Sequence, residues 1–200
     1  MKAHENPFRS SVVEGIRYAL APDDLDQLAR KALTLRCCCL LGPHGTGKTT
    51  LLEDLEPIFK KRGRSTHWLC LNNTSSKDER DAAIEALRSL PTDRVFLFDG
   101  AEVLNLWQQF KLYYIVRRRK LALLATVHRK GPLPILYRTA PNWRLTRQLV
   151  RQLSNEHYSA DLIEQAQLAF DSSGGNVREV FRACYWQLAN NKKLDNLNKA

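Results

Sequence analysis

The sequence lacks any apolar run that approaches the roughly 20 consecutive residues that a helix needs to cross a bilayer. Its opening stretch, MKAHENPF, also lacks the apolar core of a secretory signal peptide. These two absences argue against a membrane-spanning or exported protein. We therefore expect a cytoplasmic protein without a membrane partner.

Cysteine is scarce, and its placement does not suit disulfide bonds. Five of the 200 residues are cysteine, and Cys37, Cys38 and Cys39 are consecutive. Successive side chains in a strand point to opposite faces of the sheet, so these neighbours are poor disulfide partners. No C-x-x-C pair is present. We expect the three thiols to be small apolar core residues, with a metal site built from them as the alternative.

Acidic residues are outnumbered by basic ones. The chain has 21 Asp and Glu against 31 Lys and Arg, which gives a net charge of +10. This excess permits contact with nucleic acid or another polyanion, and it equally suits a protein that binds a nucleotide. The length of 200 residues fits one domain, or one domain with a small appendage.

Residues 42–49 read GPHGTGKT, which is the G-x-x-x-x-G-K-[ST] pattern of a phosphate-binding loop. Its glycines let the backbone curl tightly, so that the amides form a concave nest for phosphate oxygens. In this motif the lysine contacts the β- and γ-phosphates and the last hydroxyl is a ligand for Mg²⁺. The expected nucleotide-binding residues here are Gly42, Pro43, His44, Gly45, Thr46, Gly47, Lys48, Thr49 and Thr50, with Thr49 as a metal ligand.

The residues around this loop support the motif. Residues 35–41 are a short apolar run, typical of a strand buried on both faces. Residues 50–59 have helical spacing, with leucines on one side. A strand, a glycine loop and a helix are the context that the motif requires, and the positive end of the helix faces the phosphates. A chance glycine loop is the alternative.

Strands and helices are expected to alternate along the first two thirds of the chain. This order predicts an α/β fold, with an open parallel sheet and helices on both faces. In such sheets ligands bind beyond the carboxyl ends of the strands. We expect further strands over residues 66–71, 94–98 and 121–126, and helices over residues 22–33, 77–90 and 103–119.

Two strand ends carry polar side chains suited to a nucleotide site. Asp99 follows an apolar strand and is expected to hold Mg²⁺, while Glu102 is a candidate to orient the attacking water. An ordinary turn residue before Gly100 is the alternative for Asp99. Thr126 or His128, at the end of the fourth strand, is a candidate to sense the γ-phosphate, with a solvent-facing strand end as the alternative.

The last third of the chain predicts a helix over residues 159–170, a turn over 171–176 and a second helix over 177–188. Arg178 lies at the start of the second helix. A small helical lid of this kind can close over a bound nucleotide. Arg129, Arg138 and Arg144 are further candidates to stabilise transition-state charge, although surface arginines are commoner.

Taken together, these motifs resemble the AAA-plus family of P-loop ATPases, particularly its initiator-like and transposition-helper-like branches. The resemblance covers residues 35–190 and rests on residues 42–49, on residues 95–99 with Glu102, on Thr126, and on residues 174–178. The last segment is similar to the family's "sensor 2", whose arginine reaches the nucleotide phosphates. In this chain that arginine is Arg178.

The resemblance implies an ATPase with ATP and Mg²⁺ as cofactors and with Lys48, Asp99, Glu102 and Arg178 as catalytic residues. It also implies that residues 6–9 lie near the adenine. Two departures matter. The family usually has Asp followed directly by Glu, whereas Gly100 and Ala101 intervene here, and the lid is short. Relatives often form rings, so a homo-oligomer is one expectation and a monomer stays equally open.

We expect an N-terminal segment packing on the core (1–34), a P-loop NTPase core (35–146), a small helical lid (147–191) and a polar tail (192–200). The expected function is a Mg-dependent ATPase that couples ATP binding and hydrolysis to a conformational or assembly change on a macromolecule, with DNA or a protein as the candidate partner. The chain has no Asn-Lys-x-Asp segment to read guanine, which favours ATP. A P-loop small-molecule kinase that clamps a phosphoryl group with residues 117–120, and a nucleotide-dependent scaffold with little turnover, are the alternatives.

Overall fold

The computed structural model describes residues 3–197, with side chains described through residue 190. The chain forms two compact units. The sheet unit comprises residues 17–42 and 47–139. The helical unit comprises residues 43–46 together with the chain before residue 17 and after residue 139.

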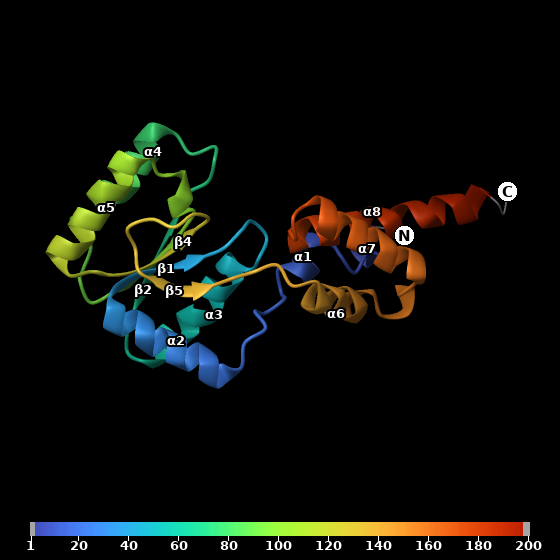
Figure 1. Ribbon diagram of the computed structural model, residues 1–200, viewed down its shortest axis with the longest axis horizontal. Helices are drawn as coiled ribbons and strands as arrows, with labels where there is room; N and C mark the ends of the chain where they lie inside the picture. Colours follow the sequence, from blue (N-terminus) through green and yellow to red (C-terminus); the bar gives the residue numbers. More distant parts are fainter. Residues whose placement is uncertain (1–2, 198–200) are drawn as a thin grey trace. The chain divides into compact units, whose positions relative to one another are not determined.

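A five-stranded parallel sheet organises the sheet unit (Figure 1). Its strands lie in the order β2-β3-β4-β1-β5, and every neighbouring pair is parallel. All five residues of β1 are buried, as expected for a strand covered on both faces. The strands are β1 (Cys37–Leu41), β2 (Thr66–Cys70), β3 (Val95–Asp99), β4 (Ala122–Val127) and β5 (Ile135–Arg138).

Helices cover both faces of this sheet, as the sequence predicted. One face packs against α2 (Pro22–Leu35) and α3 (Lys48–Lys61), and Cys38 lies in that core. The other face packs against α4 (Lys77–Ala86) and α5 (Leu106–Arg119), and Cys37 and Cys39 lie in that core. The three thiols therefore alternate across the sheet and are buried among apolar side chains.

Some boundaries in the sheet unit differ from the prediction for local reasons. A 3-10 helix, η2 (Ala101–Val103), precedes the helix expected over residues 103–119, which begins three residues later than expected, at Leu106. The α-helix starts only after Asn105, because Asn105 and Gln108 form a reciprocal capping box there. The sequence did not predict β5, which has only four residues and follows a Pro-rich segment.

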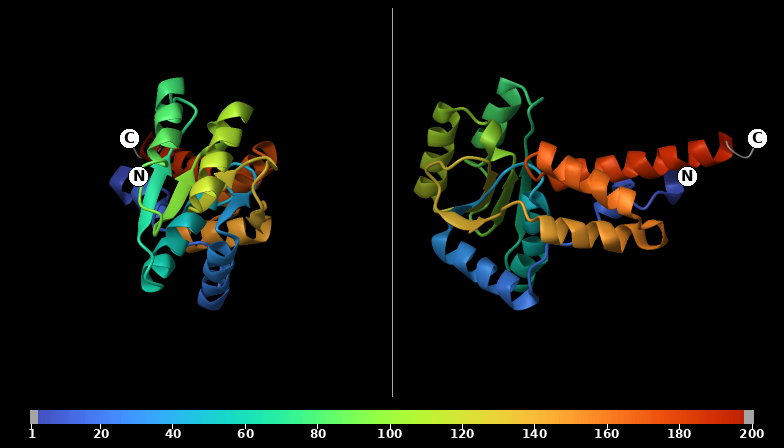
Figure 2. Two further views of the ribbon diagram at one scale, coloured as in Figure 1. Left: turned by 90° about the vertical axis from the view of Figure 1, so that its left-hand side faces the viewer. Right: turned by 45° about the vertical axis from the view of Figure 1, so that its right-hand side comes forward.

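The helical unit contains α1 (Ser10–Val13), α6 (Trp143–Ser154), α7 (Ala160–Ser172) and α8 (Val177–Leu197). Figure 2 shows α6, α7 and α8 side by side. The sequence predicted α7 and α8 but not α6, and the boundary expected at residue 147 falls within α6. The buried side chains that hold this unit together are Phe8, Val150, Leu162, Ala166, Val180, Phe181, Cys184 and Leu188.

In the part of the chain that the structure describes, no helix combines the length and the apolar character needed to cross a bilayer.

Candidate nucleotide site

The phosphate loop joins the end of β1 to the start of α3, as its motif requires. Gly47 caps α3 with a φ of 83°, and Gly45 has a φ of 68°. Both values lie in the left-handed region that glycine adopts without strain. Gly47 also faces the ring of Tyr18, and a Cβ atom built on Gly47 would lie 2.9 Å from that ring.

Lys48 reaches across the loop to its first residue, Gly42. Its side chain is buried, and Nζ donates a hydrogen bond of 2.8 Å to the carbonyl oxygen of Gly42. This bond holds the ammonium group across the mouth of the loop. Thr46, which is also buried, donates from Oγ1 to the carbonyl oxygen of Pro43 at 2.8 Å and fixes the turn between them.

Three polar residues meet beyond the carboxyl ends of the strands. Thr49 Oγ1 donates to Asp99 Oδ2 at 2.9 Å, and Thr126 Oγ1 donates to Asp99 Oδ1 at 2.8 Å. Thr126 Oγ1 also accepts a hydrogen bond of 2.9 Å from the amide of Gly100. The parallel register explains this meeting, because Phe98 on β3 pairs with Ala125 on β4, which places their successors side by side. The structure thus brings together three residues that are far apart in the sequence.

Glu102 lies at the same edge, although it is separated from Asp99 in the sequence. Gly100, with a φ of 85°, turns the chain after β3, and η2 then carries Glu102 back toward the end of β4. Its Oε1 lies 3.1 Å from Nε2 of His128, which directly follows β4. The two inserted residues therefore form a tight turn that keeps the carboxylate at the strand edge.

The environment of Glu102 favours its neutral form. Burial raises the pKa of this carboxyl above its ordinary value, and the charge of Asp99 adds to the rise, while Lys48 opposes it. Its second oxygen, Oε2, is buried and has no hydrogen-bond partner among the described residues. One oxygen thus contacts His128, and the other is a buried acceptor that a hydrogen bond would stabilise.

In the helical unit, the tip of the phosphate loop contacts the segment that starts α8. The amide of Val177 donates to the carbonyl oxygen of Gly45 at 3.3 Å. A side chain on Gly45 would overlap the carboxamide of Asn176. The Oδ1 atom of Asn176 accepts a hydrogen bond of 3.1 Å from the amide of Arg178. Arg178, whose side chain is exposed, is the second residue of α8 and directly follows Val177, which contacts the loop.

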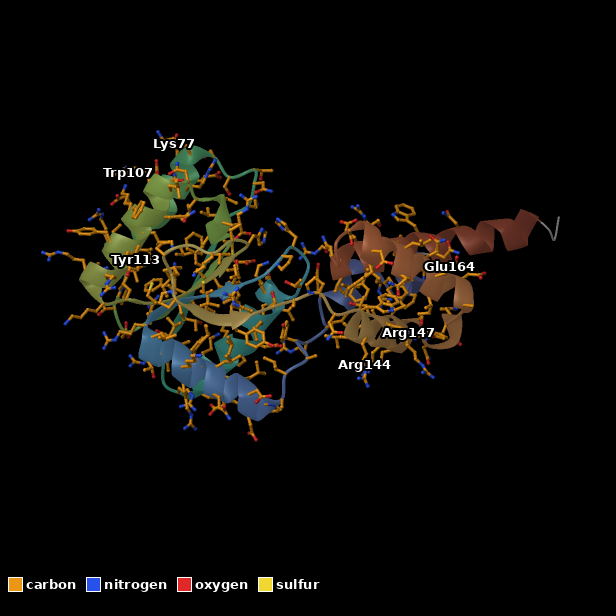
Figure 3. The ribbon with its side chains drawn as sticks, in the orientation of Figure 1. Lys77, Trp107, Tyr113, Arg144, Arg147 and Glu164 are labelled. Carbon is orange, nitrogen blue, oxygen red and sulfur yellow. The ribbon has the colours of Figure 1, made fainter. Side chains whose placement is uncertain are left out.

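The exposure of the remaining predicted residues varies with their place in the fold. Pro43 and His44 are exposed on the loop, and Thr50 is half-buried in the first turn of α3. Arg129 and Arg138 are exposed in the sheet unit. Arg144 is exposed on α6, and Figure 3 shows it pointing outward from the helical unit.

The segment expected near the adenine has structural contacts within the helical unit. Asn6 is buried, and its Nδ2 atom donates to the carbonyl oxygen of Tyr185 at 3.0 Å. The rings of Phe8 and Phe181 lie 6.0 Å apart. These contacts fasten the N-terminal residues to α8.

Tyr18 is a neighbour of the loop that the sequence did not indicate. Its amide donates to Asp54 Oδ2 at 2.8 Å, and Arg17 forms an ion pair of 3.0 Å with the same carboxylate. The ring of Tyr18 packs edge-on against Tyr137 at 6.2 Å and borders Gly47. The available signal was Asp54, a carboxylate on the leucine-rich face of α3, where burial requires a partner.

No protein-family model matches the sequence, and no curated protein matches it. Among solved structures, the replication initiator DnaA bound to AMPPCP and single-stranded DNA is similar, with a TM-score of 0.58 and 16% identity over 94% of this chain and 66% of that one. Hsp104 with ATPγS and FITC casein has a TM-score of 0.58 and 14% identity, over 94% of this chain and 42% of that one. The S. cerevisiae Hsp104–ADP complex has a TM-score of 0.53 and 14% identity, over 97% and 35%.

The chain spans less than two thirds of the length of each of these proteins. At this identity the likeness concerns the fold alone. The chain has the fold of the AAA-plus P-loop ATPases.

Proposed function

We propose that the protein is an ATP-binding, Mg-dependent ATPase that couples nucleotide binding and hydrolysis to a conformational or assembly change on a macromolecular partner. The observation that carries this proposal is the meeting of Thr49, Asp99 and Thr126 beside the phosphate loop. Within the loop, Lys48 is held at the mouth. An ATPase needs these groups at one strand edge.

Thr49 and Asp99 fit a magnesium ion. Mg²⁺ prefers hard oxygen ligands and is usually bound by one or two carboxylates together with phosphate oxygens and water. The hydroxyl of Thr49 and the carboxylate of Asp99 are such ligands, and their oxygens lie 2.9 Å apart. A bound Mg²⁺ would neutralise phosphate charge. Thr126 would keep the carboxylate of Asp99 oriented through its own hydrogen bond.

Glu102 is our candidate for the residue that orients the attacking water. A water-positioning group must lie within hydrogen-bond reach of its water, and Oε2 of Glu102 is the oxygen without a described partner. His128 would hold the opposite oxygen and so set the orientation of the carboxylate. The charge of Lys48 lowers the pKa of Glu102 against the effect of burial. This interaction supports placing Glu102 near the phosphates that Lys48 would contact.

Arg178 and the helical unit are our candidates for the element that responds to nucleotide. The hydrogen bond from Val177 to Gly45 joins the start of α8 to the phosphate loop. A change in the loop on binding phosphate would therefore act directly on that helix. Arg178 would add a cation for the phosphates, as the resemblance implies. The partner that such a movement would act on is DNA or a protein.

The scaffold alternative keeps one observation in its favour, which is the contact between Glu102 and His128, because a carboxylate held by its neighbour is a poor base.

The kinase alternative is weakened at residues 117–120. Arg119 donates to the carbonyl oxygens of Leu87 at 2.6 Å and of Leu90 at 2.9 Å, so it serves the fold. ATP remains the proposed nucleotide.

Calorimetric titration with ATP, with and without Mg²⁺, tests the binding half of the proposal. We expect Mg-dependent binding that Lys48→Ala abolishes. Lys61→Ala, an exposed lysine at the end of the same helix, should bind as the wild type does. Failure of the wild-type protein to bind ATP would overturn the proposal.

A further inference from the structure

Helix α5 presents apolar side chains on two opposite sides. Its inner side, with Gln108, Leu112, Ile115 and Val116, is buried against the sheet unit. Its outer side carries large apolar residues that are exposed, and Figure 3 shows Trp107 pointing outward from the helix. The exposed fractions are 74% for Leu106, 80% for Trp107, 61% for Phe110 and 60% for Tyr114.

These four residues form one continuous stripe. Trp107, Phe110 and Tyr114 have the spacing i, i+3, i+7, which places them along one line of a helix. Leu106 lies four residues before Phe110 and widens the stripe. The other large exposed hydrophobic residues in the described part of the chain come from four different elements or their flanking turns: Leu35, Tyr158, Leu168 and Trp186.

A helix that is apolar on both sides is normally buried on both sides. Monomeric soluble proteins seldom leave several large apolar side chains exposed together, and such patches mark interaction sites. Trp, Tyr, Phe and Arg are the residues enriched in protein interfaces and their energetic centres. The composition of the stripe is therefore that of an interface core.

Charge continues the stripe at its C-terminal end. Arg117 and Arg118 are exposed and lie one further turn along the same side of α5, which contains no acidic residue. Arg117 is held over the ring of Tyr113 at 5.4 Å and donates to its hydroxyl at 2.6 Å. By contrast, Lys111 forms an ion pair with Glu85 at 2.6 Å.

We propose that this surface, the α5 outer face (Leu106, Trp107, Phe110, Tyr114, Arg117 and Arg118), docks an amphipathic helix of a partner protein whose apolar stripe ends in acidic residues. Charge complementarity identifies the occupant, because carboxylates opposite Arg117 and Arg118 would match the positive charge at this end of the stripe. The inference goes beyond the proposed function and does not require nucleotide turnover.

Two other occupants fit the surface less well. A nucleic acid would need cations along the length of the aromatic stripe to follow its backbone, whereas the arginines lie at one end and the stripe starts with an aliphatic residue, Leu106. A second copy of this chain would meet the same basic, acid-free helix, and the net charge of +10 opposes close self-association.

A displayed library of amphipathic helices tests the proposal. The library is sorted for binding to the wild-type chain and against the double variant Trp107→Ala/Phe110→Ala. We expect the enriched helices to carry Asp or Glu at one end of an apolar stripe. The affinity of the purified peptides should fall about tenfold or more in each of the single variants Trp107→Ala and Phe110→Ala, as for central interface aromatics. Trp186→Ala, which removes an exposed tryptophan from α8, should leave binding unchanged.

A charge swap tests whether the two arginines select the acidic end of the peptide. The double variant Arg117→Glu/Arg118→Glu should lose the acidic peptides and bind their lysine-substituted twins instead. Two results would overturn the proposal: enriched peptides without acidic ends, or peptide binding that is unchanged in Trp107→Ala and in Phe110→Ala. Two further results would also overturn it: a dimer in sedimentation that Phe110→Ala abolishes, or oligothymidylate binding that Trp107→Ala abolishes, because each would assign a different occupant.

Discussion

Oε1 of Glu102 lies 3.1 Å from Nε2 of His128, at the strand edge that also carries Asp99 and Thr126. The pair joins η2 to the end of β4. The contact keeps the carboxylate of Glu102 at this strand edge, although two residues separate Glu102 from Asp99 in the sequence. The contact also leaves the other carboxylate oxygen of Glu102 buried and without a described partner.

Replacing Glu102 by Gln should separate binding from turnover. The amide keeps the size of the side chain but cannot accept a proton from water, so ATP binding should persist while turnover falls by about 100-fold or more. Calorimetric titration and phosphate release measure the two quantities on the same preparation. Unchanged turnover would reject Glu102 as the water-orienting residue and would leave its contact with His128 as a structural one.

The pH dependence of turnover should reflect the raised pKa of Glu102. Burial favours its protonated form, and only the carboxylate can orient water as a base. Turnover should therefore fall as the pH falls through this raised pKa, at a higher pH than an exposed glutamate would give. Phosphate release measured across acidic to neutral pH checks this. The same acidic limb in the residual turnover of Glu102→Gln would show that another group causes it.

Thr126→Val should destabilise the fold as well as the site. The hydroxyl donates to Asp99 and accepts from the amide of Gly100, and the substitution leaves both partners without this bond in a buried setting. We expect a loss of about 1–3 kcal/mol in the free energy of unfolding, measured in urea. Thr34→Val, at an exposed position on α2, should change it by less than about 0.5 kcal/mol. Equal effects at both positions would contradict the network.

Gly45→Ala should be more damaging than its backbone conformation alone requires. Gly45 and Gly174 have similar φ values, 68° and 64°, but a Cβ atom on Gly45 would overlap Asn176, whereas one on Gly174 would meet open space. Gly174→Ala should cost about 1–2 kcal/mol for the left-handed backbone. Gly45→Ala should cost more and also weaken ATP binding. Urea unfolding and calorimetry of both variants test this. Equal losses of unfolding free energy in Gly45→Ala and Gly174→Ala would argue against the contact between the loop and α8.

The parts of this molecule that follow from local spacing could be predicted from the sequence. The phosphate loop is a contiguous motif, and Asp99 and Thr126 each end an apolar strand, so a parallel sheet had to bring them to one edge. Glu102 was harder, because its position depends on the turn at Gly100. The short strand β5, which follows prolines, gave too little periodic signal.

Two features were missed for different reasons. Helix α6 (WRLTRQLVRQLS) carries Trp143, Leu149, Val150 and Leu153 at helical spacing, and they pack in the helical core, so its sequence did contain a helix signal among the arginines. On α5, the spacing of Trp107, Phe110 and Tyr114 in the sequence is that of one side of a helix. It could not show that the opposite side of the helix faces the sheet and leaves these three exposed.

We propose that this chain hydrolyses ATP through its phosphate loop in response to a macromolecular partner. The most direct test is phosphate release by the purified protein, with and without DNA, and with Lys48→Ala as the control. We predict turnover that Lys48→Ala abolishes and that DNA increases if DNA is the partner, while an increase with a protein partner alone would identify that class instead. ATP binding without any turnover under these conditions would contradict the claim and favour a nucleotide-dependent scaffold.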